Sequence, residues 1–258
     1  MNDGRIKRAF NLIELLSVMA VIAILATLLL SALARGKAQG QSVVCKNHLR
    51  QTGIAMAMYV GLDNHHYPPA WGRDTGVAQT WADRLIPYSP INWTNPAWHC
   101  PSYISQGGII KKSIKNPDQQ SFIHTSYSYN SFGIADVKGS PWLGLGFKRP
   151  LAAEPEVIAP AEMYIIGDSR TFRDMLTFGE GVVKDLSGNL IMQPFGRFSE
   201  ETTPVHGNGY NILFADSHVI SIQRKDYLFP RRTSRNWNRD NQPHEEVWAP
   251  RKDWCVQE

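Results

Sequence analysis

Several motifs that carry chemistry are missing from this chain of 258 residues. It has three cysteines and no Cys-x-x-Cys spacing, which argues against a zinc site of the finger or ribbon type. It also lacks the Gly-x-Ser-x-Gly motif of serine hydrolases, the spacing of an EF-hand, internal repeats and low-complexity tracts. We therefore expect the protein not to be an enzyme and to carry no resident cofactor.

Charge is weak and dispersed, with 27 Lys and Arg against 23 Asp and Glu, a net charge of +4. The mean hydropathy is only -0.30 although one long apolar run is present, so the remainder of the chain is polar. We interpret the one late basic cluster as a solvated face and expect no nucleic-acid partner. Its members are Arg224, Lys225, Arg231, Arg232, Arg235 and Arg239.

The apolar run lies near the N-terminus. From Leu15 to Leu33 there are 19 residues whose polar members are Ser17, Thr27 and Ser31. A helix needs about 20 apolar residues to cross a bilayer core, so we expect a single membrane span over about residues 12–34. Basic residues precede it, which favours a cytoplasmic N-terminus and an exported remainder.

Glu14 stands just inside this run, where an unpaired carboxylate would cost several kcal/mol. An ordinary secretory signal peptide would have a shorter apolar region, followed by small residues at the cleavage site. A plain signal anchor fits the hydropathy, but it has no use for Glu14.

The segment Phe10-Asn11-Leu12-Ile13-Glu14 after a basic leader resembles the N-terminus of type IV prepilins and type II secretion pseudopilins. The resemblance implies that residues 1–9 are a leader and that prepilin peptidase cuts between Ala9 and Phe10 and methylates Phe10. It also implies that Glu14 pairs with the terminal amine of a neighbouring subunit in a bacterial inner membrane. Ala9 departs from the glycine usual before the cut.

Helical spacing of apolar residues continues past the span, so we expect a pilin-like N-terminal helix over residues 10–62. The fold class is α+β, with this helix packed on an antiparallel β-sheet in an exported domain of residues 63–258. We expect one helix from Trp81 to Tyr88 and a loop over 107–120. Strands are expected at Ser126–Asn130, Tyr164–Gly167, Gly181–Lys184, Leu190–Gln193, Tyr210–Ala215 and Val219–Gln223.

A second signature begins at His206, which nine residues separate from Asp216, with His218 following. This pattern resembles the prepilin-associated H-X9-DG domain, and residues 206–223 read as its hairpin. Ser217 stands where glycine is usual, so we expect a different turn type. Other stretches that match the same family are Cys45–Gln51, Tyr59–Pro69, Cys100–Ser102, Ser126–Asn130 and Gly167–Ser169.

Three roles remain open for His206, Asp216 and His218. They could form a metal triad; His206 could be a base activated by Asp168 or Asp216; or they could make hydrogen bonds within the fold, which we favour. An oxidising compartment would allow a disulfide between Cys45 and Cys100, leaving Cys255 over.

Calcium is a weaker possibility, because the acidic residues that would bind it are scattered. They are Asp63, Asp74, Asp83, Asp136 and Asp168. The expected function is structural: processed subunits assemble into a pseudopilus or surface filament, with type II secretion as one setting. The alternative is an anchored domain that binds polysaccharide through its aromatic residues, among them Trp71, Trp81, Trp93, Trp98 and Trp142.

Overall fold

A computed structural model describes residues 11–62, 65–72, 79–89, 95–105, 112–113, 122–123, 126–134, 143–146, 151–168, 205–227 and 230–248. The chain divides into two compact units, Met1–Gly40 and Gln41–Glu258. The strands expected at Gly181–Lys184 and Leu190–Gln193 lie outside the described residues, as does Cys255.

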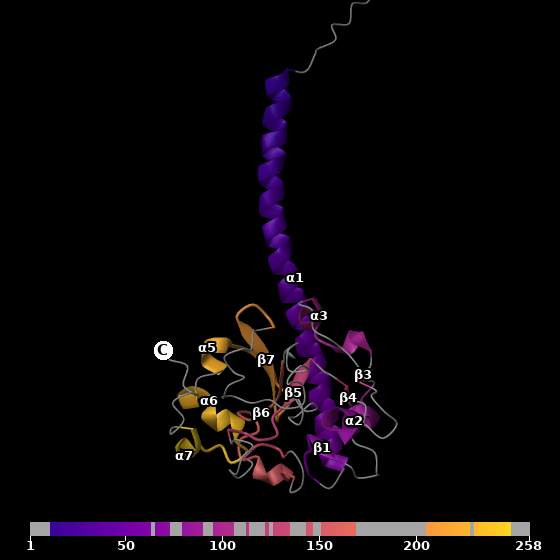
Figure 1. Ribbon diagram of the computed structural model, residues 1–258, viewed down its shortest axis with the longest axis vertical. Helices are drawn as coiled ribbons and strands as arrows, with labels where there is room; N and C mark the ends of the chain where they lie inside the picture. The colour runs from indigo at the N-terminus through magenta and orange to yellow at the C-terminus, as the bar shows by residue number, and fades with distance from the viewer. Residues whose placement is uncertain are drawn as a thin grey trace, which may run out of the picture. The chain divides into compact units, whose positions relative to one another are not determined.

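Helix α1 runs from Leu12 to Leu62 without interruption and is the indigo helix of Figure 1. Its 51 residues correspond to ~77 Å of helix at about 1.5 Å per residue. Its C-terminal end at Leu62 is the end expected from the sequence.

The N-terminal end of α1 carries a capping box. Oδ1 of Asn11 accepts the backbone N–H of Ile13 at 3.4 Å, and Oε2 of Glu14 accepts the N–H of Asn11 at 3.1 Å. These two bonds satisfy donors that a helix start otherwise leaves unpaired. Glu14 therefore has a local role that the sequence analysis did not foresee.

In the first unit, α1 exposes every large apolar side chain from Leu12 to Leu33, with exposed fractions between 49% and 76%. Exposed apolar surface of this extent is rare on soluble monomers. By length and composition, the helix can serve as a single membrane span or a signal anchor.

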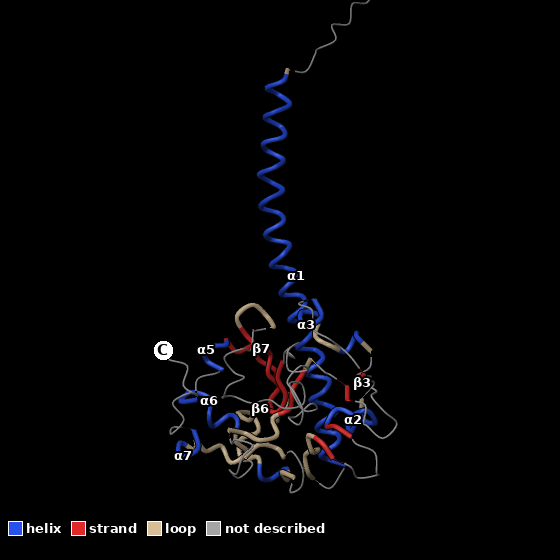
Figure 2. The backbone as a smooth tube through the Cα atoms, in the orientation of Figure 1, coloured by secondary structure: helices blue, strands red, loops and turns tan. Residues whose placement is uncertain are grey.

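The second unit is built on an antiparallel sheet in the order β5-β6-β7-β8. Figure 2 draws its strands in red and labels β6 and β7. Its strands are β5 (Tyr127–Tyr129), β6 (Tyr164–Asp168), β7 (Gly209–Phe214) and β8 (Val219–Gln223). All four were predicted from the sequence to within two residues at either end. With α1, this sheet confirms the α+β class.

Both faces of β7 are buried, and because successive side chains point to opposite faces, neighbouring residues enter different cores. Leu213 belongs to a core that also contains Leu49 and Met56 of α1. Ile212 lies in a second core with Tyr227 and Trp237. The sheet of this unit therefore has α1 residues on one face and residues of the C-terminal segment on the other.

That C-terminal segment is helical, which the sequence analysis did not predict. It forms α5 (Arg224–Tyr227), α6 (Pro230–Trp237) and α7 (Glu245–Trp248). Arg231, Arg232 and Arg235 of α6 are exposed, as expected for a solvated basic face, whereas Trp237 is fully buried. The exposed basic residues dominate the sequence of α6, and of its described side chains the buried ones are Thr233, Ser234 and Trp237.

Two further expectations need correction. The helix expected from Trp81 to Tyr88 is α2 (Trp81–Leu85), capped by Thr80, followed by the 3-10 turn η1 (Ile86–Tyr88). The proline in η1 cannot donate the backbone bond that would continue α2. The loop expected over 107–120 contains β3 (Lys112–Ser113), which pairs with β4 (Phe122–Ile123).

The other short elements of the unit lie around the core. They are β1 (Trp71–Gly72) paired with β2 (Gln79–Thr80), the 3-10 turns η2 (Pro96–Trp98) and η3 (Glu154–Glu156), and α3 (Pro101–Ser105).

The β7–β8 hairpin forms as predicted, with Asp216 and Ser217 in its turn. Ser217 adopts φ of +73°, so the turn keeps the left-handed residue that glycine would supply, and the expectation of another turn type is wrong. The turn lies against Gly53 of α1, because a Cβ placed on Gly53 would be 3.1 Å from the Ser217 Cβ. It would also be 2.9 Å from Cδ1 of Leu213.

Candidate functional site

The residues predicted to act in processing and assembly lie at the start of the chain. Ala9 and Phe10 are outside the described residues, and Glu14 is in the first turn of α1. Oε2 of Glu14 caps the helix, and within the described part of the chain its Oε1 has no hydrogen-bond partner. The carboxylate therefore retains capacity for a second cation or donor.

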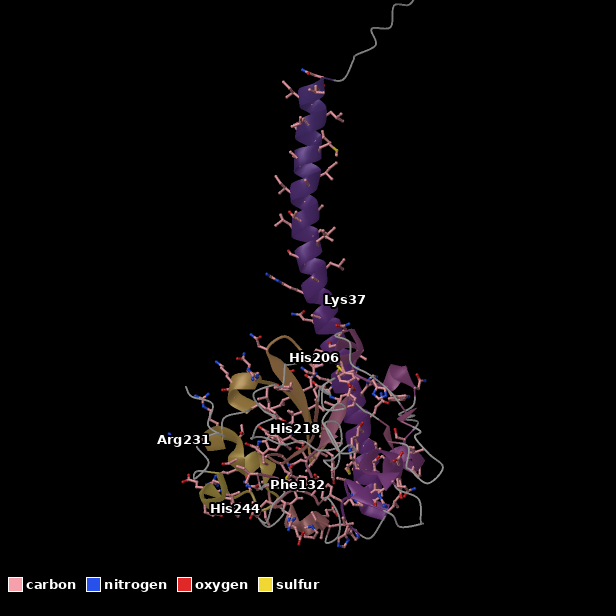
Figure 3. All side chains as sticks on the ribbon, in the orientation of Figure 1. Lys37, Phe132, His206, His218, Arg231 and His244 are labelled. Carbon is pink, nitrogen blue, oxygen red and sulfur yellow. A yellow bond between two sulfur atoms is a disulfide. The ribbon has the colours of Figure 1, made fainter. Side chains whose placement is uncertain are left out.

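The metal triad of His206, Asp216 and His218, one of the three alternatives left open by the sequence, is not formed. His206 makes an isolated bridge to Gly209, at the beginning of β7, whereas Asp216 and His218 lie beyond its end (Figure 3). Oδ1 of Asp216 accepts the backbone N–H of His218 at 3.1 Å and also contacts its Nδ1. The nine-residue spacing thus holds the two motif ends apart along a strand.

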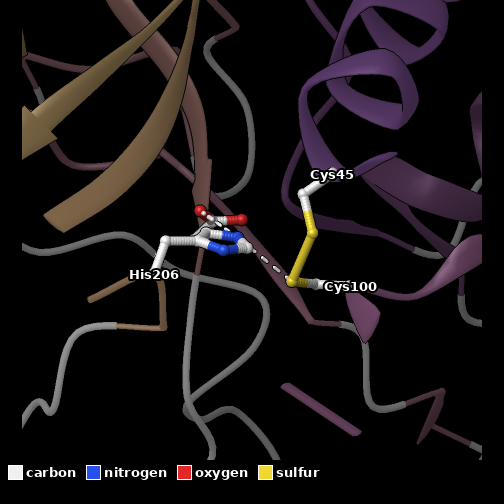
Figure 4. Close-up of side chains that lie close together, drawn as sticks. Cys45, Cys100 and His206 are labelled. Carbon is white, nitrogen blue, oxygen red and sulfur yellow. Dashed lines mark hydrogen bonds and ion pairs between the residues drawn. A yellow bond between two sulfur atoms is a disulfide. The ribbon is translucent and has the colours of Figure 1, made fainter. Parts of the chain in front are cut away.

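His206 instead meets a disulfide and a buried acid. Cys45 of α1 and Cys100 form the expected disulfide, with their Cα atoms 5.1 Å apart. Nε2 of His206 lies 3.2 Å from Sγ of Cys100 and 3.3 Å from Oδ2 of Asp168, the last residue of β6 (Figure 4). Both cysteines are fully buried, and the side chains of His206 and Asp168 are 7% and 0% exposed.

Hydrogen bonds on the far side of the ring assign its tautomer. Nδ1 of His206 lies 3.2 Å from Oγ of Ser102, and this hydroxyl donates to Oε1 of Gln41, also at 3.2 Å. With the Ser102 hydroxyl donating to Gln41, the tautomer that fits this network is the one in which Nδ1 of His206 donates to Ser102. Nε2 of the neutral ring then presents its lone pair to Asp168 and Cys100.

Electrostatics agree with a neutral arrangement. Burial raises the pKa of Asp168 to about 7, although hydrogen bonds from Asn211 oppose the shift. Burial, helped by the positive charge of Lys46, lowers the pKa of His206 to about 4. Burial therefore favours the neutral form of both groups, and a contact of 3.3 Å between Nε2 of His206 and Oδ2 of Asp168 suits a hydrogen bond between neutral partners.

The carboxyl group of Asp168 makes fewer hydrogen bonds with the described residues than it can accept. Its Oδ2 accepts the backbone N–H of Asn211 at 2.6 Å, which ties the end of β6 to β7. Its Oδ1 is buried and has no hydrogen-bond partner among the described residues. Leaving a buried oxygen unpaired costs about 1–3 kcal/mol of stability. The hydrogen bonds of the described residues therefore do not account for an acidic side chain at this position.

The arrangement limits the chemistry open to the cluster. Ser102, His206 and Asp168 are in the contact order of a catalytic triad, but Ser102 is only 4% exposed, so its hydroxyl is not presented to a substrate. One ligand atom from each of Cys45, Cys100, Asp168 and His206 lies within 4.8 Å of the others. These are donor types that bind zinc.

The four side chains come from four separate stretches that the sequence analysis had singled out. Each lay in a different motif; Cys45 was expected to meet Cys100, and a pairing of His206 with Asp168 was one open alternative, but the two pairs were not expected to meet each other. The absence of Cys-x-x-Cys excludes a local zinc motif, but it does not exclude a cluster assembled from distant segments. The sequence feature that could have pointed to this cluster is that four separate motif stretches each contain a potential metal ligand.

Other predicted residues have structural roles or are not described. Asp83 caps α2 by accepting the N–H of Thr80 at 2.8 Å. Asp63, Asp74 and Asp136 lie outside the described residues, as do Trp93, Trp142 and the side chain of Trp71. Trp81 is fully buried and stacks on Tyr129, so it offers no surface to a polysaccharide, and Trp98 is half-buried.

Comparison with protein-family models finds no match to this chain, and comparisons with curated proteins and solved structures find none either.

Proposed function

We propose that this protein is a pilin-like structural subunit, processed by prepilin peptidase between Ala9 and Phe10 and assembled through the first part of α1. The observation that carries the proposal is the exposed apolar helix from Leu12 to Leu33 with a carboxylate, Glu14, in its first turn. The apolar side chains need an apolar environment, and the carboxylate, once in that environment, needs a cation near the start of the helix. A membrane containing neighbouring subunits supplies both.

The cation would be the Phe10 amine of another subunit, freed by cleavage. In a low dielectric an ammonium and a carboxylate attract strongly, and each alone would be costly. The capping geometry is compatible with this role, because Oε2 of Glu14 serves its own helix while Oε1 has no partner in the described chain. A structural role is also compatible with the second unit, because the cluster of Cys45, Cys100, Asp168 and His206 is buried there and is not presented to a substrate.

Glu14 has two separable tasks, helix capping and charge neutralisation, and two substitutions distinguish them. Glu14→Gln keeps an oxygen that can accept the Asn11 N–H but removes the charge. Asn11→Ala removes the other capping side chain and leaves the charge. We expect Glu14→Gln to abolish filament formation in the native host and Asn11→Ala to reduce it mildly.

The size of the effect follows from the ion pair. A loss of ~1.4 kcal/mol at each subunit addition weakens that step about tenfold, and a desolvated pair is worth more. Filaments are counted by electron microscopy, and membrane levels of each variant by immunoblot. If Glu14→Gln assembles as well as the natural chain, charge pairing is not the assembly mechanism.

Processing has its own readout. Mass analysis of the N-terminus from native membranes should find a methylated Phe10 in the natural chain and in Glu14→Gln. An intact leader together with normal filaments would contradict the proposed cleavage.

A further inference from the structure

We propose that, when Cys45 and Cys100 are reduced, the second unit binds one zinc ion through Cys45, Cys100, Asp168 and His206. The disulfide and the zinc centre are then alternative states of the same pair of sulfur atoms. This site does not depend on filament assembly.

Geometry is the first support. Tetrahedral zinc with sulfur at about 2.3 Å and nitrogen or oxygen at about 2.0–2.2 Å places its ligand atoms about 3.3–3.8 Å apart. Nε2 of His206 is already 3.2 Å from Sγ of Cys100 and 3.3 Å from Oδ2 of Asp168. The four ligand atoms lie within 4.8 Å of one another, so zinc binding requires the two sulfur atoms to separate after reduction and the wider pairs to close by about 1 Å.

The surroundings of His206 are the second support. Its Nδ1 donates to Ser102, which in turn donates to Gln41, so Nε2 directs its lone pair at the cluster. Fixing a ligand histidine through its other nitrogen is how proteins orient metal ligands. A hydrophobic core that only covered a disulfide would not need this series of hydrogen bonds.

Asp168 is the third support. Its buried Oδ1 has no partner in the described part of the chain, although the side chain is fully covered. Two thiolates and this carboxylate carry three negative charges against the two positive charges of zinc. The charge of Lys46, which acts on both Asp168 and His206, offsets the remainder.

The chemical step balances with a phosphine as reductant. Phosphine and water convert the disulfide to two thiols, and the phosphine leaves as its oxide. Zinc then displaces both thiol protons and the carboxyl proton of Asp168 as two Zn–S bonds and one Zn–O bond form, while Nε2 of His206 supplies its lone pair; the released protons go to solvent. All four ligands are buried, as in a closed structural site and not a catalytic one.

Cobalt(II) provides the test, because it reports tetrahedral thiolate binding by colour. The full chain carrying Cys255→Ser, in detergent, is reduced by phosphine without oxygen and titrated with cobalt. We expect one equivalent to bind with sulfur-to-cobalt charge-transfer absorption, zinc to displace it, and the oxidised chain to show no such band. Equal binding by the oxidised chain, or no charge-transfer band in the reduced one, would overturn the proposal.

The chain offers a matched control in the hairpin turn, where Asp216 and His218 form a similar pair outside the cluster. Asp168→Asn and His206→Gln should each weaken cobalt binding at least about tenfold, whereas Asp216→Asn and His218→Gln should not. Circular dichroism of the oxidised variants checks folding. If the two pairs of variants behave alike, the four-residue site is wrong.

A measurement on the unaltered chain covers variants that fail to fold. Zinc should protect Cys45 and Cys100 of the reduced chain from iodoacetamide, as read by peptide mass spectrometry, while Cys255 stays reactive. Equal alkylation of all three with and without zinc would refute the site.

Discussion

Gly53 allows us to test how closely the hairpin turn packs on α1. A Cβ at this position would be 2.9 Å from Cδ1 of Leu213 and 3.1 Å from Cβ of Ser217. Leu213 is fully buried, so it has little room to move. Gly53→Ala should therefore overpack the interface between helix and hairpin, although alanine is the better helix former.

The magnitude is a difference of two terms. Replacing a mid-helix glycine by alanine stabilises by up to about 1 kcal/mol, while overpacking a core costs about 1–3 kcal/mol. Gly40 and Gly61 lie on the same helix with no atom within 4 Å of an added Cβ. Relative to Gly40→Ala and Gly61→Ala, we expect Gly53→Ala to lower the free energy of unfolding by about 1–3 kcal/mol.

The assay is urea unfolding of the full chain in detergent, followed by tryptophan fluorescence. Ser217→Gly in the same background should recover part of the loss, because it removes two of the three close atoms, Cβ and Oγ of Ser217, and relieves a positive φ. Stabilisation by Gly53→Ala equal to that by Gly61→Ala would refute the argument that this glycine exists for close approach.

Two further expectations concern the second unit. Replacing Cys45 and Cys100 by alanine should lower the free energy of unfolding of the oxidised chain by ~4 kcal/mol, since the disulfide spans 55 residues; a loss below about 1 kcal/mol would contradict this. For His244, burial alone would lower the pKa, but hydrogen bonds to Asp240 and Glu246 raise it overall. Its contribution to stability should therefore be largest below pH 6.5 and disappear as the pH rises through the raised pKa. Melting of His244→Gln against the natural chain from pH 5 to 9 measures this, and an advantage that grows with pH would be inconsistent with it.

The H-X9-D spacing has a physical explanation in the fold. His206 reaches the disulfide and Asp168 at one end of β7, and the turn at Ser217 reaches α1 at the other end. The motif therefore ties both ends of one strand to the rest of the unit. Its two named residues do not need to meet in order to matter.

Features with a local cause could be read from the sequence. The apolar helix, the end of α1 at Leu62 and the β7–β8 hairpin each depend on residues close together in the chain. Helix α6 was not predicted because few of its residues pack in the core and its basic residues hide any apolar periodicity in the sequence. The turn at Ser217 was not predicted because its conformation, which serine alone disfavours, accompanies a close approach to Gly53 and a hydrogen bond from its N–H to the Phe214 carbonyl.

The sequence by itself determined that this protein has a long apolar helix with a carboxylate at its start and an antiparallel sheet beyond it, because periodicity and turn chemistry act over a few residues. Tertiary structure alone decided that Asp168 and His206 would join Cys45 and Cys100, since their meeting depends on how distant strands and helices pack. Spacing along a chain carries no record of such a meeting. It arises only when α1, β6 and the residues before β7 close around one core.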